Sequence, residues 1–166
     1  FYDRSTCLYE AINTAMRIQK GATIALVCES IYPQDIEVLK THAQETNIQI
    51  ITVAIDPQNG RTDIEDLKQK LNQYKGQINS ITFPQVNNFG NLEDVNLLTD
   101  LAREHQIQSI AMIDPMLLAT EGLLPPSQFG SNQLGAHMIV GEGQHLCLGP
   151  NYGGPGLGIF GIRFNE

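Results

Sequence analysis

The side chains best suited to chemistry lie in three short segments, each of which follows an apolar run. These segments are Phe83–Gly90 (FPQVNNFG), Ile113–Pro115 (IDP) and Gly141–Cys147 (GEGQHLC). They supply amides, carboxylates, an imidazole and a thiol, which are groups that bind ligands or move protons. If the apolar runs are parallel strands, the three segments meet at the carboxyl ends of the sheet, where ligands bind in such proteins. They therefore form the candidate site.

Asn87, Asn88 and Asp114 each have a structural interpretation beside a functional one. Asn and Gly favour left-handed backbone and local side-chain hydrogen bonds, so the two asparagines before Gly90 could serve turn formation alone. Asp114 could cap a turn before Pro115. It could also be the charged partner that an enzyme of this architecture keeps at a strand end.

The last of the three segments suggests several kinds of site. Gly141 and Gly143 could let a ligand approach the backbone, but they complete neither GxGxxG nor GxxxxGK[ST]. Glu142, His145 and Cys147 have the spacing E-x-x-H-x-C, which matches no familiar zinc pattern. A His145–Cys147 nucleophile pair is disfavoured because catalytic cysteines usually have their histidine far away in sequence. We expect neither a metal site nor a cysteine nucleophile here.

Composition restricts the possible partners. The chain has 166 residues, a net charge of −8 and no basic run, which argues against nucleic acids and membranes as partners. We expect no membrane span and no signal peptide. Three cysteines without a CxxC motif indicate reduced thiols in a cytoplasmic protein. No lysine follows Lys75, so the second half cannot supply a lysine Schiff base.

Apolar runs alternate with helix signals, and these elements must position the three segments. Strands are expected at 23–28, 48–55, 78–83, 109–113, 137–140 and 158–164. Helices are expected to begin at Ser5 or Thr6, at Pro33, at a capping box from Thr62 to Glu65, and at Asn91 or a neighbour. A further short turn or helix is expected near 126–129.

This alternation predicts one α/β domain with a doubly wound, mostly parallel sheet and helices on both faces. The weak alternation in 158–164 favours a late strand that is antiparallel or at the edge of the sheet. His137 begins an apolar run and is expected to be a hydrogen-bonded core or rim histidine.

Several motifs in these segments resemble one enzyme family. They are F-P-Q-V-N-N-F-G-N-L-E-D at 83–94, D-P at 114–115, G-E-G-Q at 141–144, G-G-P at 153–155, and the opening Tyr2-Asp3. Together they resemble the glycine decarboxylase P-protein, specifically subunit 1 of its two-subunit bacterial form. Arg4 stands where the family has glycine and Val86 where it has proline. The resemblance implies the large domain of a fold-type I pyridoxal-phosphate (PLP) enzyme. Residues 1–166 would be the central part of that domain, without its N-terminal arm and C-terminal small domain.

The resemblance also implies a function. The complete heterotetrameric enzyme decarboxylates glycine on PLP and passes the aminomethyl group to the lipoyl arm of the H-protein. Asp114 would match the carboxylate that faces the pyridine nitrogen. The PLP lysine would stand near Gln144 and His145, where this chain has no lysine. All five lysines precede the third expected strand: Lys20, Lys40, Lys68, Lys70 and Lys75.

The resemblance therefore implies a subunit 1 with no catalytic residue, no metal and no cofactor of its own, inactive alone, beside a PLP-bearing subunit 2. Vestigial or interface candidates are Asn87, Asn88, Asp114, Glu142, Gln144 and His145. Two alternatives stay open. One is a binding or scaffold domain that lost catalysis, which the departures at Arg4 and Val86 suggest. The other is an independent hydrolase that uses Cys147 or His145.

Overall fold

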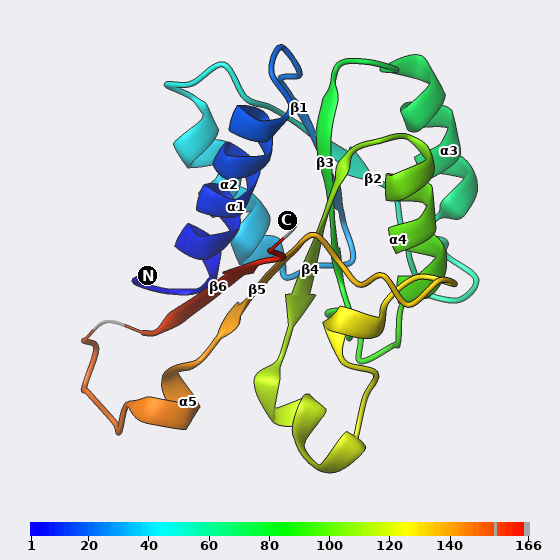
Figure 1. Ribbon diagram of the computed structural model, residues 1–166. Coiled ribbons are helices and arrows are strands. Elements are labelled where there is room, and N and C mark those ends of the chain that lie inside the picture. Colours follow the sequence, from blue (N-terminus) through cyan, green and yellow to red (C-terminus); the bar gives the residue numbers. More distant parts are fainter. Residues whose placement is uncertain (155, 165–166) are drawn as a thin grey trace.

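Six strands form one sheet in the computed structural model (Figure 1), which describes residues 1–154 and 156–164, without the side chains of residues 120 and 121. The strands are β1 (Ile24–Cys28), β2 (Gln49–Val53), β3 (Ile78–Pro84), β4 (Gln108–Ile113), β5 (Met138–Glu142) and β6 (Gly158–Ile162). Their order is β2-β1-β3-β4-β5-β6, and only β6 runs antiparallel to its neighbour. The predicted mostly parallel sheet with a late antiparallel strand is confirmed.

Helices cover both faces of the sheet, as predicted. On one face lie α1 (Arg4–Ile18) and α2 (Pro33–Ala43), and on the other lie α3 (Ile64–Gln73) and α4 (Val95–Glu104) (Figure 1). The short helix expected near 126–129 is η2 (Pro126–Gln128). Two other short helices, η1 (Pro115–Glu121) and α5 (Gln144–Cys147), were not predicted, because segments this short show no helical periodicity.

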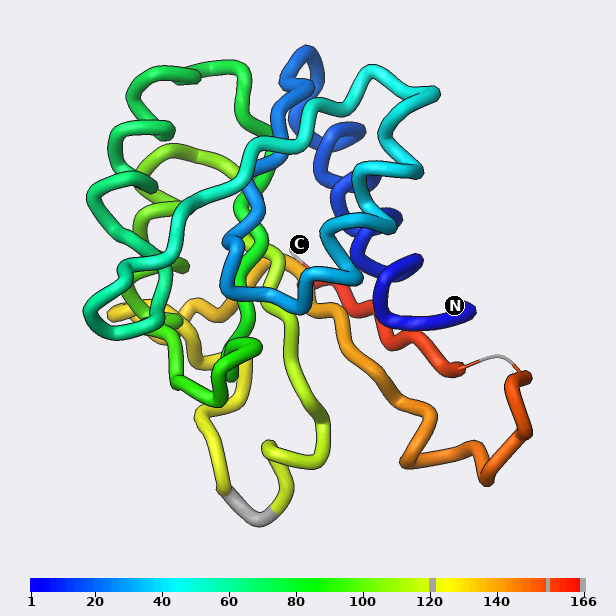
Figure 2. The backbone as a smooth tube through the Cα atoms, turned by 180° about the vertical axis from the view of Figure 1, so that it is seen from behind, coloured from blue at the N-terminus to red at the C-terminus, as the bar shows by residue number. Residues whose placement is uncertain are grey.

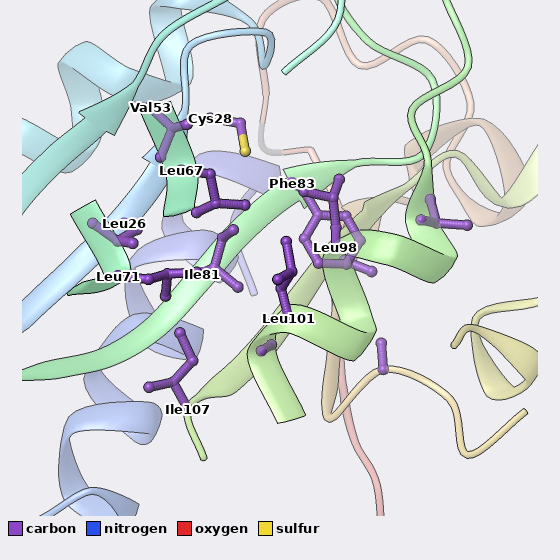
Figure 3. Packing of buried hydrophobic residues seen from close by; sticks show 14 of the residues in the cluster. Leu26, Cys28, Val53, Leu67, Leu71, Ile81, Phe83, Leu98, Leu101 and Ile107 are labelled. Carbon is purple, nitrogen blue, oxygen red and sulfur yellow. The ribbon is translucent and has the colours of Figure 1, made fainter. Parts of the chain in front are cut away.

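The core consists of two apolar layers, one on each face of the sheet. Successive residues of a strand point to opposite faces, so β1 contributes to both layers and all its residues are buried. Leu26, Ile81 and Phe83 of the sheet pack on Leu67 and Leu98 of the helices α3 and α4 (Figure 3). This double cover explains why the strand sequences are almost continuously apolar.

The first helix begins at Arg4, before both of the expected caps, Ser5 and Thr6. Asp3 is the N-cap: its carboxylate accepts from the Thr6 backbone N–H at 2.8 Å, and the Thr6 hydroxyl accepts from the Asp3 N–H in return. Ser5 is not the cap, because its hydroxyl donates instead to Asp35 at 2.5 Å. Both expected residues therefore contribute to this helix end, in roles other than the predicted one.

The caps expected at Thr62 and Asn91 are also wrong. Asp63 caps α3 and Asp94 caps α4, each by accepting backbone N–H groups of the first turn. Thr62 does not complete the capping box with Glu65, because its backbone N–H donates to the buried carboxylate of Glu93 at 3.0 Å and its hydroxyl lies 3.3 Å from that of Ser30. A tertiary hydrogen bond thus overrides the local capping-box pattern.

The first residues of the chain lie beside β6 at the edge of the sheet (Figure 2). The Gly158 N–H donates to the Phe1 carbonyl at 2.9 Å, and the Phe1 amine donates to the Gly158 carbonyl at 3.2 Å. The ring of Phe1 also meets the ring of Phe160 edge to face, with centroids 5.9 Å apart. Within the described residues, no helix is both long enough and apolar enough to cross a membrane.

Candidate functional site

A cavity of about 110 Å³ opens at the carboxyl ends of the strands, beside the first turn of α1. Its polar lining consists of Arg4, Tyr32, Asn88, Asp114 and Glu142, and apolar side chains from the ends of β3 and β4 complete it. The structure thus brings three of the predicted candidates together, one from the loop after each of β3 and β4 and one from the end of β5. This arrangement follows from the parallel strands, whose carboxyl ends share one edge of the sheet.

Asn87 has a structural role and does not line the cavity. It is 3% exposed, and its side-chain oxygen accepts from the backbone N–H groups of Phe89 and Asn91 at 3.0 and 3.1 Å. Its side-chain amide donates to the Gly60 carbonyl and to Glu93 at 2.8 and 2.9 Å. The amide is therefore fully used in holding two loops together. The structural interpretation holds for Asn87, whereas Asn88 lines the cavity.

Asp114 sits at the end of β4 and caps η1, with its Oδ1 accepting from the Met116 N–H at 3.0 Å. The Nε2 of His145 lies 3.7 Å from the same oxygen, and the side chains of His145 and Asp114 are 38% and 53% exposed respectively. A pair this exposed is weak, on the order of 0–1 kcal/mol when the imidazole is protonated. The predicted role of Asp114 as a turn cap is confirmed, and its carboxylate also lines the cavity at the end of β4.

Glu142 ties the end of β5 to the loop before β6. Its Oε1 accepts from the backbone N–H groups of Gln144 and Leu157, at 2.9 and 3.2 Å. Gln144 begins α5 and does not line the cavity. The carboxylate of Glu142 is thereby held in place at the cavity wall.

Packing inside the sheet requires the first glycine of the G-E-G-Q motif. A Cβ on Gly141 would lie 2.6 Å from the Ile113 carbonyl oxygen, a backbone atom that cannot move aside without disturbing β4. A Cβ on Gly143 would lie 2.7 Å from the end of the Ile159 side chain, which can shift, so packing restricts this position less strictly. Close approach of neighbouring strands therefore accounts for Gly141 without any ligand.

Arg4 is the cavity residue that was missing from the predicted site. Its Nε donates to Asp35 at 2.9 Å, its guanidinium carbon lies 4.6 Å from the centre of the Tyr32 ring, and it lines the cavity. One feature of the sequence could have pointed to Arg4: it stands where the resembled family has a glycine. Its ion-pair partner is 31 residues away, which sequence spacing does not reveal.

Burial lowers the reactivity of two cysteines and lowers the basicity of His137. Burial raises the pKa of Cys7 to about 11 and that of Cys28 to about 12, so both thiols are protonated at neutral pH. Cys147 is exposed, and its neighbour His145 faces Asp114. The Nδ1 of His137 is hydrogen-bonded to Ser109, and burial, with help from Arg103 and Arg163, lowers its pKa to about 4. His137 is the hydrogen-bonded histidine that was predicted.

Among the described residues, no three His, Cys, Asp or Glu side chains lie close enough together to hold a metal ion.

The model of the glycine cleavage system P-protein family matches residues 1–165, nearly the whole chain. The chain belongs to this family. It is 33% identical over 162 residues to a probable glycine dehydrogenase (decarboxylating) subunit 1 of Nitrosospira multiformis, covering 98% of this chain and 34% of that protein. The protein of the same name from Saccharolobus solfataricus is 36% identical over 165 residues, covering 99% of this chain and 34% of its own length. The chain thus spans about a third of the length of these curated relatives.

Solved structures agree with this assignment. The crystal structure of a glycine decarboxylase (P-protein) in inhibitor-bound form superposes with a TM-score of 0.77 at 25% identity, covering 98% of this chain and 33% of that one. An apo cysteine desulfurase from Thermococcus onnurineus NA1 gives a TM-score of 0.67 at 17% identity, covering 98% and 37%. The second similarity supports the fold alone, which is that of the fold-type I PLP-dependent enzymes.

The cavity of this P-protein chain does not fit PLP. A phosphate is often bound by the free N–H groups of a helix N-terminus. At the first turn of α1, beside the cavity, Asp3 accepts from the Thr6 N–H, and the 2% exposed Asp35 accepts from Ser5 and Arg4. Two carboxylates already lie at this helix N-terminus, which makes it unfavourable for a phosphate.

The remaining requirements of PLP are also unmet. No lysine lines the cavity, whereas Lys68 and Lys75 line a separate hollow near the start of β3 and β4. The volume of about 110 Å³ is below the roughly 300–1,000 Å³ usual for ligands the size of a cofactor. No chemical step of PLP can therefore be derived from these residues.

Proposed function

We propose that this chain is part of subunit 1 of a two-subunit glycine-decarboxylating P-protein, and that it supports a second subunit which carries PLP and its lysine. One observation carries the proposal. The G-E-G-Q motif lies at the carboxyl end of β5, and the PLP lysine would stand near its last residue, Gln144, and the next residue, His145. The names of the relatives, which include subunit 1, agree with this division of labour.

The positions of the five lysines support the same proposal. They lie in α2 and α3 or just after α1 and α3, on the helices that flank the sheet and away from the cavity. Lys40, Lys68 and Lys70 are paired with Glu37, Glu65 and Asp66 on their own helices. None of the five lysines lies at the end of β5, where the PLP lysine would stand. Under the proposal, decarboxylation of glycine and delivery of the aminomethyl group to the lipoyl H-protein take place with the partner subunit's cofactor.

The surface around the cavity is suited to contact with a partner. Tyr32, Phe89, Met116, Leu117 and Leu146, all in loops or short helices at the carboxyl ends of the strands, are 41–60% exposed. Large apolar side chains gathered on one edge of a protein usually mark an interaction surface. We propose that subunit 2 covers this edge, and that residues 1–166 correspond to the central part of a large domain.

Co-expression with the second subunit of the same organism tests the proposal. We expect the protein that carries this chain to co-purify with subunit 2, and we expect glycine–bicarbonate exchange to require both. PLP absorbance should accompany subunit 2 alone. A matched pair of variants locates the contact: Phe89→Ser should weaken association, whereas Phe164→Ser, which also removes an exposed phenylalanine but away from this edge, should not. Failure to associate, or exchange by subunit 2 alone, would contradict the proposal.

A second function, that of a scaffold or binding domain without catalysis, is favoured by one observation: Arg4, which stands where the resembled family has glycine, pairs with Asp35 at the first turn of α1. The co-expression experiment separates the two functions, because a scaffold domain would leave glycine–bicarbonate exchange unaffected by its removal.

A further inference from the structure

We propose that a groove beside β5 and β6 binds a small amphipathic carboxylate, with its anionic head at Arg163 and His137 and its apolar body along β5. Apolar residues of β4, β5, β6, η1 and η2 form most of the lining of this β5–β6 groove. It is a different hollow from the cavity at the carboxyl ends of the strands, although Ile113 borders both. The proposal concerns non-covalent binding and does not depend on assembly with a second subunit, so the two proposals can fail separately.

The groove lies on the face of β5 and β6 opposite α1. On its own face α1 packs on both strands, whereas α3 packs mainly on β2, and α4 on β3 and β4. Ile139 and Gly161 are opposite each other in the antiparallel pair and form part of the groove floor, while Leu118 and Pro126 add apolar walls. The volume of about 470 Å³ falls within the roughly 300–1,000 Å³ usual for sites that bind small molecules.

His137 and Arg163 stand side by side at one end of the β5–β6 groove. The register of the strand pair extends to them, because the Arg163 N–H donates to the His137 carbonyl at 2.8 Å. Opposite residues of an antiparallel pair project to the same face, and so do alternate residues along a strand. His137 and Arg163 therefore lie on the same face as Ile139 and Gly161, and both line the groove.

Ser109 determines which nitrogen of His137 is available to a ligand. Nδ1 of the ring accepts from the Ser109 backbone N–H at 3.1 Å, so the proton of the neutral imidazole is on Nε2. Within the described residues, neither this Nε2 nor the guanidinium of Arg163 has a hydrogen-bond partner. Two side chains thus offer free N–H donors to the same groove, and one of them carries a full positive charge.

The end of the groove is positive although the whole chain has a net charge of −8. Burial, followed by the charges of Arg103 and Arg163, lowers the pKa of His137 to about 4. Over the part of the chain that is described, neither arginine forms an ion pair, and Asp100, the acidic residue near Arg103, is hydrogen-bonded to Ser131 instead. A carboxylate is therefore attracted to this end of the groove, whereas an amine is repelled.

The lining of the groove determines the rest of the ligand. A carboxylate can accept two N–H groups from the planar guanidinium of Arg163 and a third from His137. The apolar floor and walls then favour an aliphatic or aromatic body over a polar one. For a ligand of roughly ten heavy atoms in an open groove, we expect a dissociation constant on the order of 0.1–1 mM.

An NMR titration of the purified protein at neutral pH tests the proposal. Phenylbutanoate is the probe; phenylbutylamine has the same body with the opposite charge, and acetate has the head without the body. We expect phenylbutanoate to bind at least about tenfold more tightly than either. Its binding should shift the ring signals of His137, but not those of His42, His105 and His145, which lie outside the groove.

The same titration repeated over a range of pH gives a second measurement. The pKa of His137 should rise from about 4 when phenylbutanoate is bound, because the carboxylate offsets the two arginines that lower it. Equal binding of phenylbutylamine, or His137 signals that do not respond, would show the proposal to be wrong. Absence of binding would do the same, whatever fills the groove instead.

Two variants assign the head and the body of the ligand to their contacts. Arg163→Gln removes the charge at the head and should weaken binding of phenylbutanoate at least about fivefold. The matched control is Arg61→Gln, the same substitution at an exposed position outside the groove. Leu118→Ser makes one wall polar and should weaken binding several-fold, whereas Leu124→Ser, outside the groove, should not.

Circular dichroism and thermal melting establish that each variant is folded. If Leu118→Ser does not fold, Arg163→Gln decides the question, because Arg163 is exposed and its side chain makes no hydrogen bond within the described residues. A folded Arg163→Gln variant that binds phenylbutanoate as the parent protein does would overturn the proposal, whatever the outcome of co-expression with subunit 2.

Discussion

Two polar clusters at the same end of the sheet differ in how completely their hydrogen bonds are satisfied. Around Asn87, the amide, the Glu93 carboxylate and the Thr62 N–H are buried and paired with one another. Around the cavity, Arg4, Asp114 and Glu142 each use only part of their hydrogen-bonding capacity within the chain. The first cluster holds loops together, and the second has donors and acceptors left for another molecule.

The comparison teaches that residue type alone does not identify a site. Asn87 and Asn88 are adjacent, identical and equally attractive as candidates, yet only Asn88 lines the cavity. A buried polar group must find its partners inside the protein, because leaving it unpaired costs about 1–3 kcal/mol. An exposed one can instead bind water or a ligand. The predictions below test this distinction, from the largest expected effect to the smallest.

Asn87→Ala should lower the free energy of unfolding by about 2–4 kcal/mol, because several buried groups lose their partner at once. The affected groups are the Glu93 carboxylate, the Gly60 carbonyl and two backbone N–H groups of the loop. Urea denaturation measures the loss, with Asn88→Ala as the matched control. Equal effects of the two substitutions would remove the distinction between the clusters.

Gly141→Ala should destabilise the chain by about 1–3 kcal/mol, since the new Cβ would push against the Ile113 carbonyl. Gly149→Ala, where a Cβ would meet nothing within 4 Å, should change stability by less than about 0.5 kcal/mol. Thermal melting of both variants provides the test. A harmless Gly141→Ala would mean that packing does not require the first glycine of the G-E-G-Q motif.

His137, at the opposite end of the sheet, is a hydrogen-bonded polar residue whose protonation changes with pH. Its pKa is lowered to about 4 in the folded chain, below the value of about 6.5 in an unfolded chain. Its contribution to stability is therefore complete above about pH 6.5 and is lost as the pH falls toward about 4. For a partly exposed ring we expect roughly 1–2 kcal/mol.

Urea denaturation as a function of pH measures this contribution. In His137→Gln the part of the pH dependence that belongs to this residue should disappear, while the remainder, which comes from carboxylates, persists. A pH dependence identical to that of the parent chain would show that His137 does not titrate in this range.

Asp114→Asn should have the smallest effect on stability, less than about 0.5 kcal/mol. The new amide oxygen can still accept the Met116 N–H, and the lost pair with His145 is exposed. Denaturation at pH 7 measures the change. A loss comparable to that of Asn87→Ala would place Asp114 among the structural residues instead.

Most of the fold could be predicted because its signals are local or periodic. Near-continuous apolar runs marked the strands, and their alternation with helices indicated the parallel sheet. The ends of elements were less predictable: three aspartates replaced the expected caps, because Ser5 and Thr62 are drawn into contacts with Asp35 and Glu93. Pro155, part of the predicted G-G-P motif, lies outside the described residues.

The sequence by itself determined the sheet architecture, the family motifs and the absence of lysine after Lys75. These depend on residue type and on spacing over a few positions. Only the tertiary structure decided that Arg4 pairs with Asp35, that Asn87 is structural, and that Arg4, Asn88, Asp114 and Glu142 share one cavity. Their juxtaposition follows from which strands become neighbours and from what each buried group must bond to, and both are set by contacts between distant parts of the chain.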